Sequence, residues 1–250
     1  MSPKGSYVGV DGCPKGWVSV ALMDAGIACL QVFASLLELW RAHSDADIIL
    51  IDMPIGLLER GPGERHCETE ARRLISLRRS SVFPVPCRQA VYADSDLAAI
   101  TANREHMKKG LSMQALAIRH KIREVDELLR SDATARRTFQ EVHPELLFTA
   151  MNSGQPMSCR KKSRDGKDER LSLLSDILGK AIVNQVMAQS AAYRRRDLQE
   201  DDVLDALAAA VAASHHEELL SIPPTPIRDV HKLPMQMVYW PHTSAAYRDQ

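Results

Sequence analysis

The first sixty residues alternate short apolar runs with segments dense in turn residues, a pattern typical of β-strands joined by tight connections. We expect three such strands over Tyr7–Val10, Trp17–Leu22 and Ile27–Phe33. A fourth run, Ile48–Ile51, is continuously apolar and ends at Asp52, which suits a strand covered by helices on both faces. The pattern therefore predicts a three-stranded meander followed by a buried strand.

After residue 64 the apolar positions recur at helical spacing. Within the segment 112–130, for example, Ile118, Ile122, Val125 and Leu129 fall three or four residues apart. Helices are predicted over Arg65–Leu77, Asp94–Lys108, Ser112–Arg130, Glu169–Gln189 and Asp201–Ser214, with a shorter helical stretch around Leu36–Trp40. Arg137–Val142 is the candidate for a fifth strand, and Met235–Tyr239 is a candidate for a last one.

These elements predict an α/β fold, with a mixed five-stranded sheet flanked by helices in a single domain over residues 1–250. The helical stretch from about residue 65 to 130 is too long for one crossover, so we expect a helical insertion between the fourth and fifth strands. We expect no membrane contact, because the start shows no signal-peptide apolar region and no apolar stretch reaches the roughly 18–20 residues that span a bilayer.

Composition narrows the functional classes. Lys plus Arg and Asp plus Glu are both 32, so the net charge is zero, which argues against a protein that coats nucleic acid through bulk charge. Aromatic residues are only 5% of the chain, so extensive base stacking along a single strand is not expected. The five cysteines form no C-x-x-C pair, which favours neither a zinc site nor a disulfide scaffold and fits a reduced cytoplasm.

Acidic residues stand where the predicted strands end. Asp11 closes the first strand, Asp52 closes the fourth, and Glu141 lies on the fifth. Asp202 and Asp205 are three residues apart at the start of the last predicted helix, so they share a face. Because sites in open α/β sheets form at the carboxyl ends of parallel strands, we expect these side chains to gather at one edge.

Gathered carboxylates repel one another unless a cation binds them. Mg²⁺ and Mn²⁺ prefer oxygen ligands, so Asp11, Asp52, Asp202 and Asp205 are the candidate metal ligands. Asp11, Asp52, Glu141 and Asp205 are the candidate catalytic residues. Each acid alone also fits a turn former or a helix cap, and Asp202 in particular suits a helix N-terminus.

Basic clusters flank the acidic residues in the sequence. Candidate phosphate contacts are Lys15, Arg79, Arg88, Lys161 and Lys162. An acidic pocket with a basic rim is what a phosphodiester substrate requires, since cations hold its backbone. The same residues also fit a solvated face, and Lys15 fits a solvated turn equally well. His143 suits either proton transfer or a structural hydrogen bond at a strand exit.

Several segments together carry a family resemblance. They are Gly9–Cys13, Gly16–Val18, Ile51–Leu57, Arg78–Pro86, Gln114, Lys121–Asp126, Glu141–Glu145 and Asp205–Leu207. In them the chain resembles the domain-of-unknown-function family 429, described as predicted nucleases of the ribonuclease H-like fold. The resemblance implies that fold, and it implies acidic site residues at Asp11, Asp52 and the last helix.

The leading functional hypothesis is a metal-dependent nuclease or phosphodiesterase that hydrolyses a nucleic-acid phosphodiester, with nucleic acid as partner and Mg²⁺ or Mn²⁺ as cofactor. It predicts that Asp11, Asp52 and Asp205 place carboxylate oxygens within about 4–8 Å of a common point. A non-catalytic adaptor of the same fold would have its acids spread apart or paired with arginines. A sugar-kinase or actin-type phosphotransferase is the third alternative, although such proteins usually need two domains of this kind.

Overall fold

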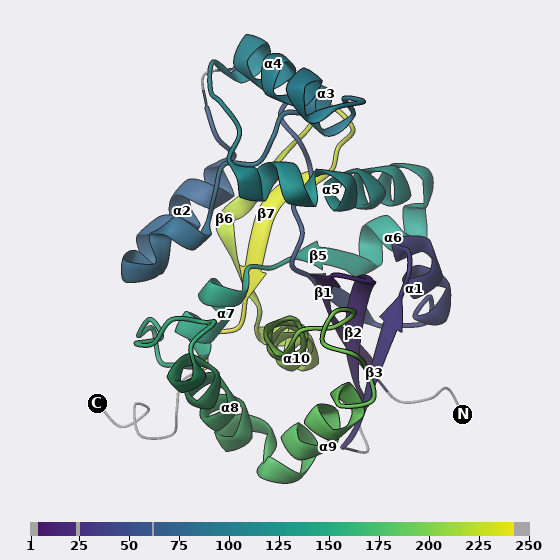
Figure 1. Ribbon diagram of the computed structural model, residues 1–250, viewed down its shortest axis with the longest axis vertical. Coiled ribbons are helices and arrows are strands. Elements are labelled where there is room, and N and C mark those ends of the chain that lie inside the picture. The colour runs from purple at the N-terminus through teal and green to yellow at the C-terminus, as the bar shows by residue number, and fades with distance from the viewer. Residues whose placement is uncertain (1–4, 24–25, 62, 243–250) are drawn as a thin grey trace.

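The computed structural model describes residues 5–23, 26–61 and 63–242, and its centre is a seven-stranded mixed sheet (Figure 1). The strands are β1 (Ser6–Cys13), β2 (Gly16–Met23), β3 (Ile27–Phe33), β4 (Ile48–Ile51), β5 (Phe139–Glu141), β6 (Leu220–Arg228) and β7 (Pro234–Tyr239). Their order is β3-β2-β1-β4-β5-β7-β6. Neighbours from β1 through β4 and β5 to β7 run parallel, and the outer pairs on both sides run antiparallel.

The α/β class and the flanking helices agree with the sequence prediction, but the predicted strand count of five is wrong. The structure extends the sheet by two strands, β7 and β6, beyond β5. β6 contains Pro223, Pro224 and Pro226, and a proline run argues against a strand in a sequence pattern because proline has no N–H to donate. The structure accommodates these prolines because β6 lies at the sheet edge, where only one side needs hydrogen bonds.

Ten α-helices occur among the described residues. They are α1 (Leu36–Ala42), α2 (His66–Leu74), α3 (Arg88–Val91), α4 (Asp96–Met107), α5 (Met113–Ser131), α6 (Ala133–Thr138), α7 (Pro144–Met151), α8 (Arg164–Leu178), α9 (Lys180–Ser190) and α10 (Glu200–Ser214). The segment between β4 and β5 holds α2 to α6. No helix in the described part of the chain combines the length and apolar character needed to cross a membrane.

Helices cover both faces of the sheet, which explains the continuous apolar run of β4. Ile48 and Leu50 pack into the core formed with α7 to α10, whereas Ile49 and Ile51 pack into the core formed with α1 and α5. In Figure 1, α10 is seen end-on near the centre. α8 and α9 lie below it in this view, and α3 and α4 lie at the top of the molecule.

The single long helix predicted over Glu169–Gln189 is two helices in the structure. Gly179 separates α8 from α9 with a φ of 86°, a conformation that side chains other than glycine rarely adopt. α8 also begins earlier than predicted, because the Ser163 hydroxyl caps it by accepting a hydrogen bond from the Gly166 amide at 3.1 Å. Residues 160–163 therefore precede the helix, and residues 164–167 belong to α8.

α10 packs directly against the backbone of β1 at Gly9. Gly9 has no side chain there: an added Cβ would lie 2.0 Å from the Ala206 carbonyl oxygen and 2.2 Å from the Ala210 amide nitrogen. The buried alanines of α10 also have small side chains, which allow the helix to approach the strand closely. This close packing brings the N-terminal half of α10 beside the end of β1, where Asp11 lies.

Candidate metal centre

Three aspartates come together from three elements that are distant in sequence. Asp11 lies near the end of β1, and Asp52 directly follows β4. β1 and β4 pair in parallel with Val10 opposite Ile51, so the next residue on each strand falls at the same level. Asp205 is the sixth residue of α10, on the helix that packs against Gly9. The close approach of α10 therefore brings the third carboxylate to the other two.

The three carboxylates converge as the sequence predicts. One oxygen each from Asp11, Asp52 and Asp205 lies within 4.8 Å of the others. The Gly12 amide donates to Asp11 Oδ1 at 2.6 Å, which fixes that side chain. Asp205 is only 1% exposed, and its Oδ1 has no hydrogen-bond partner among the described residues. A buried oxygen in this state is stabilised by a cation or a donor that enters the site.

Burial and mutual repulsion both disfavour three negative charges here. Burial raises the pKa of Asp11 well above its ordinary value, and the charges of Asp52 and Asp205 raise it further. Burial and then Asp205 raise the pKa of Asp52 to about 8. Burial also raises the pKa of Asp205, although Lys161 opposes this shift. The site therefore retains protons near neutral pH unless a cation replaces them.

The donor set fits a hard divalent cation. Two oxygens that bind one Mg²⁺ at about 2.1 Å are at most about 4.2 Å apart, so a separation of up to 4.8 Å needs only a small inward rotation of the side chains. All the donors are carboxylate oxygens, which Mg²⁺ and Mn²⁺ prefer. These aspartates could hold one such ion.

The structure places two other predicted acids next to the three aspartates but engages them differently. Asp202 is in the first turn of α10, where its Oδ2 accepts from the Gln199 amide at 3.1 Å as part of a capping box. Glu141, the last residue of β5, accepts two hydrogen bonds from Arg65, at 2.8 and 2.6 Å, and one from the Ile55 amide at 2.7 Å. Asp202 is therefore held by the helix cap, and Glu141 is held by Arg65 and Ile55.

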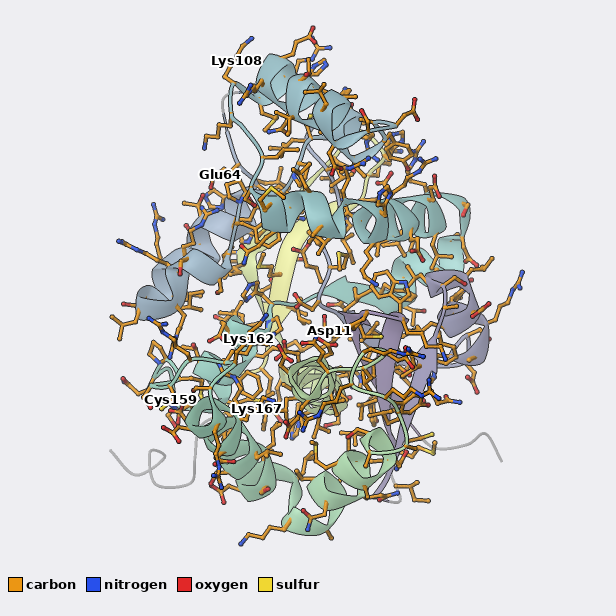
Figure 2. The ribbon with its side chains drawn as sticks, in the orientation of Figure 1. Asp11, Glu64, Lys108, Cys159, Lys162 and Lys167 are labelled. Atoms are coloured by element: carbon orange, nitrogen blue, oxygen red, sulfur yellow. The ribbon has the colours of Figure 1, made fainter. Side chains whose placement is uncertain are left out.

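Of the five predicted phosphate contacts, two lie beside the aspartates. Lys161 Nζ forms an ion pair with Asp205. Burial disfavours its charge, but Asp205 and Asp11 outweigh this effect and raise its pKa. Lys162 lines the same cavity and is exposed. Figure 2 places Asp11 and Lys162 at the centre of the molecule, close to the end of α10.

The other three predicted contacts do not line this cavity. Lys15 and Arg79 are exposed elsewhere on the surface. Arg88 is buried, and its guanidinium is engaged with three carboxylates, from Glu59, Asp126 and Asp229. The structure thus places Arg88 in an ion-pair network. The carboxylates of this network come from residues far along the chain. A sequence pattern does not show such partners.

The cavity beside the aspartates has a volume of about 330 Å³. It is also lined by Arg65, Glu68, Lys121 and Glu145, which are not among the predicted site residues. Lys121 donates to the Cys13 carbonyl at 3.2 Å and to that of Gly16, and its Nζ lies 4.7 Å from the centre of the Trp17 ring. Lys121 and Glu145 fall in segments that carry the family resemblance, and that resemblance could have identified them as site residues. No feature of the sequence pointed to Arg65 or Glu68.

The sequence profile of the family called protein of unknown function DUF429 matches residues 9–228. The chain belongs to the DUF429 family. The matched range contains all three aspartates and nearly every cavity-lining residue, so the cavity is built within the DUF429 region. Comparisons with curated proteins and with solved structures found no match.

His143 adds a neutral base to the cavity of this DUF429 protein. Burial lowers the pKa of His143 to about 4, with a smaller contribution from Lys161, while a hydrogen bond with the Ser81 backbone opposes the shift. Its Nδ1 has no partner within the part of the chain that the structure describes. The DUF429 cavity therefore combines the carboxylates of Asp11 and Asp52, three lysines and an uncharged imidazole, a set that is suited to binding a phosphate group beside a cation.

Proposed function

We propose that this DUF429 protein is a metal-dependent nuclease or phosphodiesterase in which Asp11, Asp52 and Asp205 bind Mg²⁺ or Mn²⁺. The observation that carries the proposal is the approach of three carboxylate oxygens to within 4.8 Å at the end of two parallel strands, with one buried oxygen unpartnered. Carboxylates in this arrangement are costly to keep without a cation.

The topology supports the finer assignment to a ribonuclease H-like fold. The meander of β1, β2 and β3 is followed by β4 and β5, which lie parallel to β1 on its other side and are central to the sheet. In this view β7 and β6 extend that five-stranded core.

The protein's own residues would divide the work as follows. A divalent ion held here supplies charge stabilisation for a phosphoryl group and lowers the pKa of a bound water. Lys161 would turn from Asp205 to a phosphate oxygen once a cation balances the aspartates. Lys162, already exposed in the cavity, would hold a neighbouring phosphate. His143, kept neutral by burial, would orient a water through its free Nδ1.

The test is a cleavage panel of single-stranded, duplex, hybrid and branched nucleic acids with Mg²⁺ or Mn²⁺. We expect wild-type protein to cleave at least one substrate and Asp205→Asn to lose this activity. Asp176→Asn is the matched control, because it removes an exposed carboxylate from α8, away from the cavity. Cleavage that survives Asp205→Asn or needs no metal would refute the proposal.

The adaptor hypothesis has one observation in its favour, the ion pair between Lys161 and Asp205, since a lysine already neutralises part of the cluster. One ammonium against three carboxylates still leaves an excess of negative charge. The adaptor hypothesis predicts nucleic-acid binding that is independent of metal and is never followed by cleavage. The same panel, read for binding as well as products, separates the two.

A further inference from the structure

The cavity continues well past the aspartates. Its volume of about 330 Å³ is at the lower end of the range for pockets that take small molecules. Beyond Asp11 and Asp52 much of the wall is apolar, with Val82, Phe83 and Ile118 among the residues that form it. A space of this size suits one nucleotide. A duplex, whose major groove alone is about 12 Å wide, would remain outside.

One carboxylate in this cavity is left incomplete. Glu68, in the first turn of α2, is 1% exposed and lines the cavity. Its Oε1 accepts from Arg65 Nε at 2.7 Å, but its Oε2 has no hydrogen-bond partner among residues 5–23, 26–61 and 63–242. Because an unsatisfied buried acceptor is costly, a ligand that brings an N–H donor to Oε2 gains what the protein lacks.

Arg65 fixes this carboxylate, and each of its three guanidinium nitrogens already donates to an oxygen of the protein. Its guanidinium donates to Glu68 and to both oxygens of Glu141. It also donates to the carbonyls of Ile55 and Gly56, at 3.0 and 3.3 Å. One arginine thus balances two carboxylates, so the Glu68 end of the cavity repels phosphate. The phosphate belongs near Lys161 and Lys162, which also line the cavity.

The basic residues Lys161 and Lys162 and the carboxylate of Glu68 match the two parts of a nucleotide, an anionic phosphate and a base with hydrogen-bond donors. Enzymes that take an unpaired base into a pocket hold it between apolar or aromatic side chains and read its edge by hydrogen bonds. A carboxylate oxygen reads an exocyclic amino group, as in the pairing of Glu with cytosine N4. We propose that the cavity receives the base of one unpaired nucleotide and that Glu68 Oε2 accepts a hydrogen bond from the exocyclic amino group of that base.

This inference rests on the proposed function and specifies the substrate. Cytosine is a suitable probe because uracil has the same ring and differs at position 4, where a carbonyl oxygen replaces the amino group. That oxygen would face Glu68 Oε2 and repel it. The same chemistry can come from a free mononucleotide or from an unpaired nucleotide within a strand.

The experiment compares oligodeoxycytidylate with oligodeoxyuridylate by fluorescence anisotropy, in the Asp205→Asn background with Mg²⁺ so that no cleavage occurs. We expect the cytosine oligomer to bind about tenfold more tightly, the effect of one hydrogen bond to a charged group. Adding Glu68→Gln should bring the two affinities within about threefold. Glu70→Gln, the same change on α2 but outside the cavity, should preserve the preference.

A second variant covers the case in which Glu68→Gln unfolds, which a melting curve would reveal. Ile118→Trp adds bulk to the cavity from α5 and should weaken both oligomers at least tenfold. Unchanged binding in Ile118→Trp, equal affinity for the two oligomers, or a preference that survives in folded Glu68→Gln would each overturn the inference. Cytidine and uridine monophosphates, measured alongside, show whether a free nucleotide suffices.

Failure of this inference and failure of the proposed function give different results. Metal-dependent cleavage by wild-type protein without any base preference sinks the base pocket and leaves the nuclease. A base preference that requires Glu68, with no cleavage under any metal, sinks the nuclease and leaves a nucleotide-binding protein.

Discussion

Replacing Asp52 with asparagine separates the effect of the cation from the effect of the fold. Asp52 is one of the three converging carboxylates, and asparagine keeps its size while removing its charge. At a metal concentration one hundred times the dissociation constant, binding to the folded state alone stabilises a protein by about 2.7 kcal/mol. For a chain of 250 residues, where 1 kcal/mol shifts the melting temperature by about 2–4 °C, this corresponds to about 5–11 °C.

The same substitution should leave the metal-free protein at least as stable. The pKa of Asp52 is about 8 in the folded protein against an ordinary value of 3.8, so folding takes up a proton between these values. Asparagine carries no ionisable proton, so it removes this penalty at pH 7.5. We therefore expect the metal-free melting temperature to stay level or rise by a few degrees.

The assay is thermal unfolding followed by circular dichroism at pH 7.5, first with a chelator and then with increasing Mg²⁺ or Mn²⁺. Wild-type protein and Asp176→Asn should both show the metal-dependent rise, whereas Asp52→Asn should lose most of it. Equal metal-induced shifts in wild type and Asp52→Asn would show that the cation binds elsewhere and refute the assignment of the site.

Three further results are expected. Stability of the metal-free protein should fall as pH rises from about 4 to 8, because the raised pKa of Asp52 favours folding only while the carboxyl keeps its proton. The metal-induced rise in melting temperature should grow over the upper part of that pH range. A pH series of the melting experiment measures both effects. Lys161→Met removes the ammonium that competes with the metal for Asp205, so calorimetry should show at least about tenfold tighter metal binding. Lys162→Met is the control and should leave the affinity unchanged. Equal affinities in wild type and Lys161→Met would argue against competition. Lys162→Ala should weaken nucleic-acid binding and reduce the slope of affinity against salt by about one counterion, whereas Arg79→Ala, outside the cavity, should not, as titrations at several salt concentrations would show.

The predictable part of the site is the part set by strand order and local pattern. Ile48–Ile51 reads as a strand buried on both faces, so Asp52 is placed at its end before any coordinates are known. Asp11 follows from the turn that ends its apolar run. Asp205 is recognisable because a carboxylate inside an alanine-rich apolar helix needs a partner.

The remaining features depend on contacts between distant parts of the chain. The link between Arg65 and Glu141 joins residues 76 positions apart, and Arg88 and Asp229 are 141 apart. No periodicity encodes such pairs. The break at Gly179 was missed because the apolar pattern continues through it, and only the backbone conformation ends the helix there. Glu68 was missed because its unsatisfied oxygen is visible only once the cavity is built.

The missing side chain at Gly9 has a consequence for how the site can respond to a ligand. With the Ala206 carbonyl and the Ala210 amide occupying the space of its Cβ, the backbones of α10 and β1 are already in contact and cannot move closer. Asp11 and Asp205 are thus carried on a frame of fixed spacing, and widening it would open a gap in a core filled by alanines. Any adjustment to an arriving ion falls to side chains, including that of Lys161, which pairs with Asp205 from the loop before α8. The fold therefore sets the backbone positions of these two carboxylates before any ligand arrives.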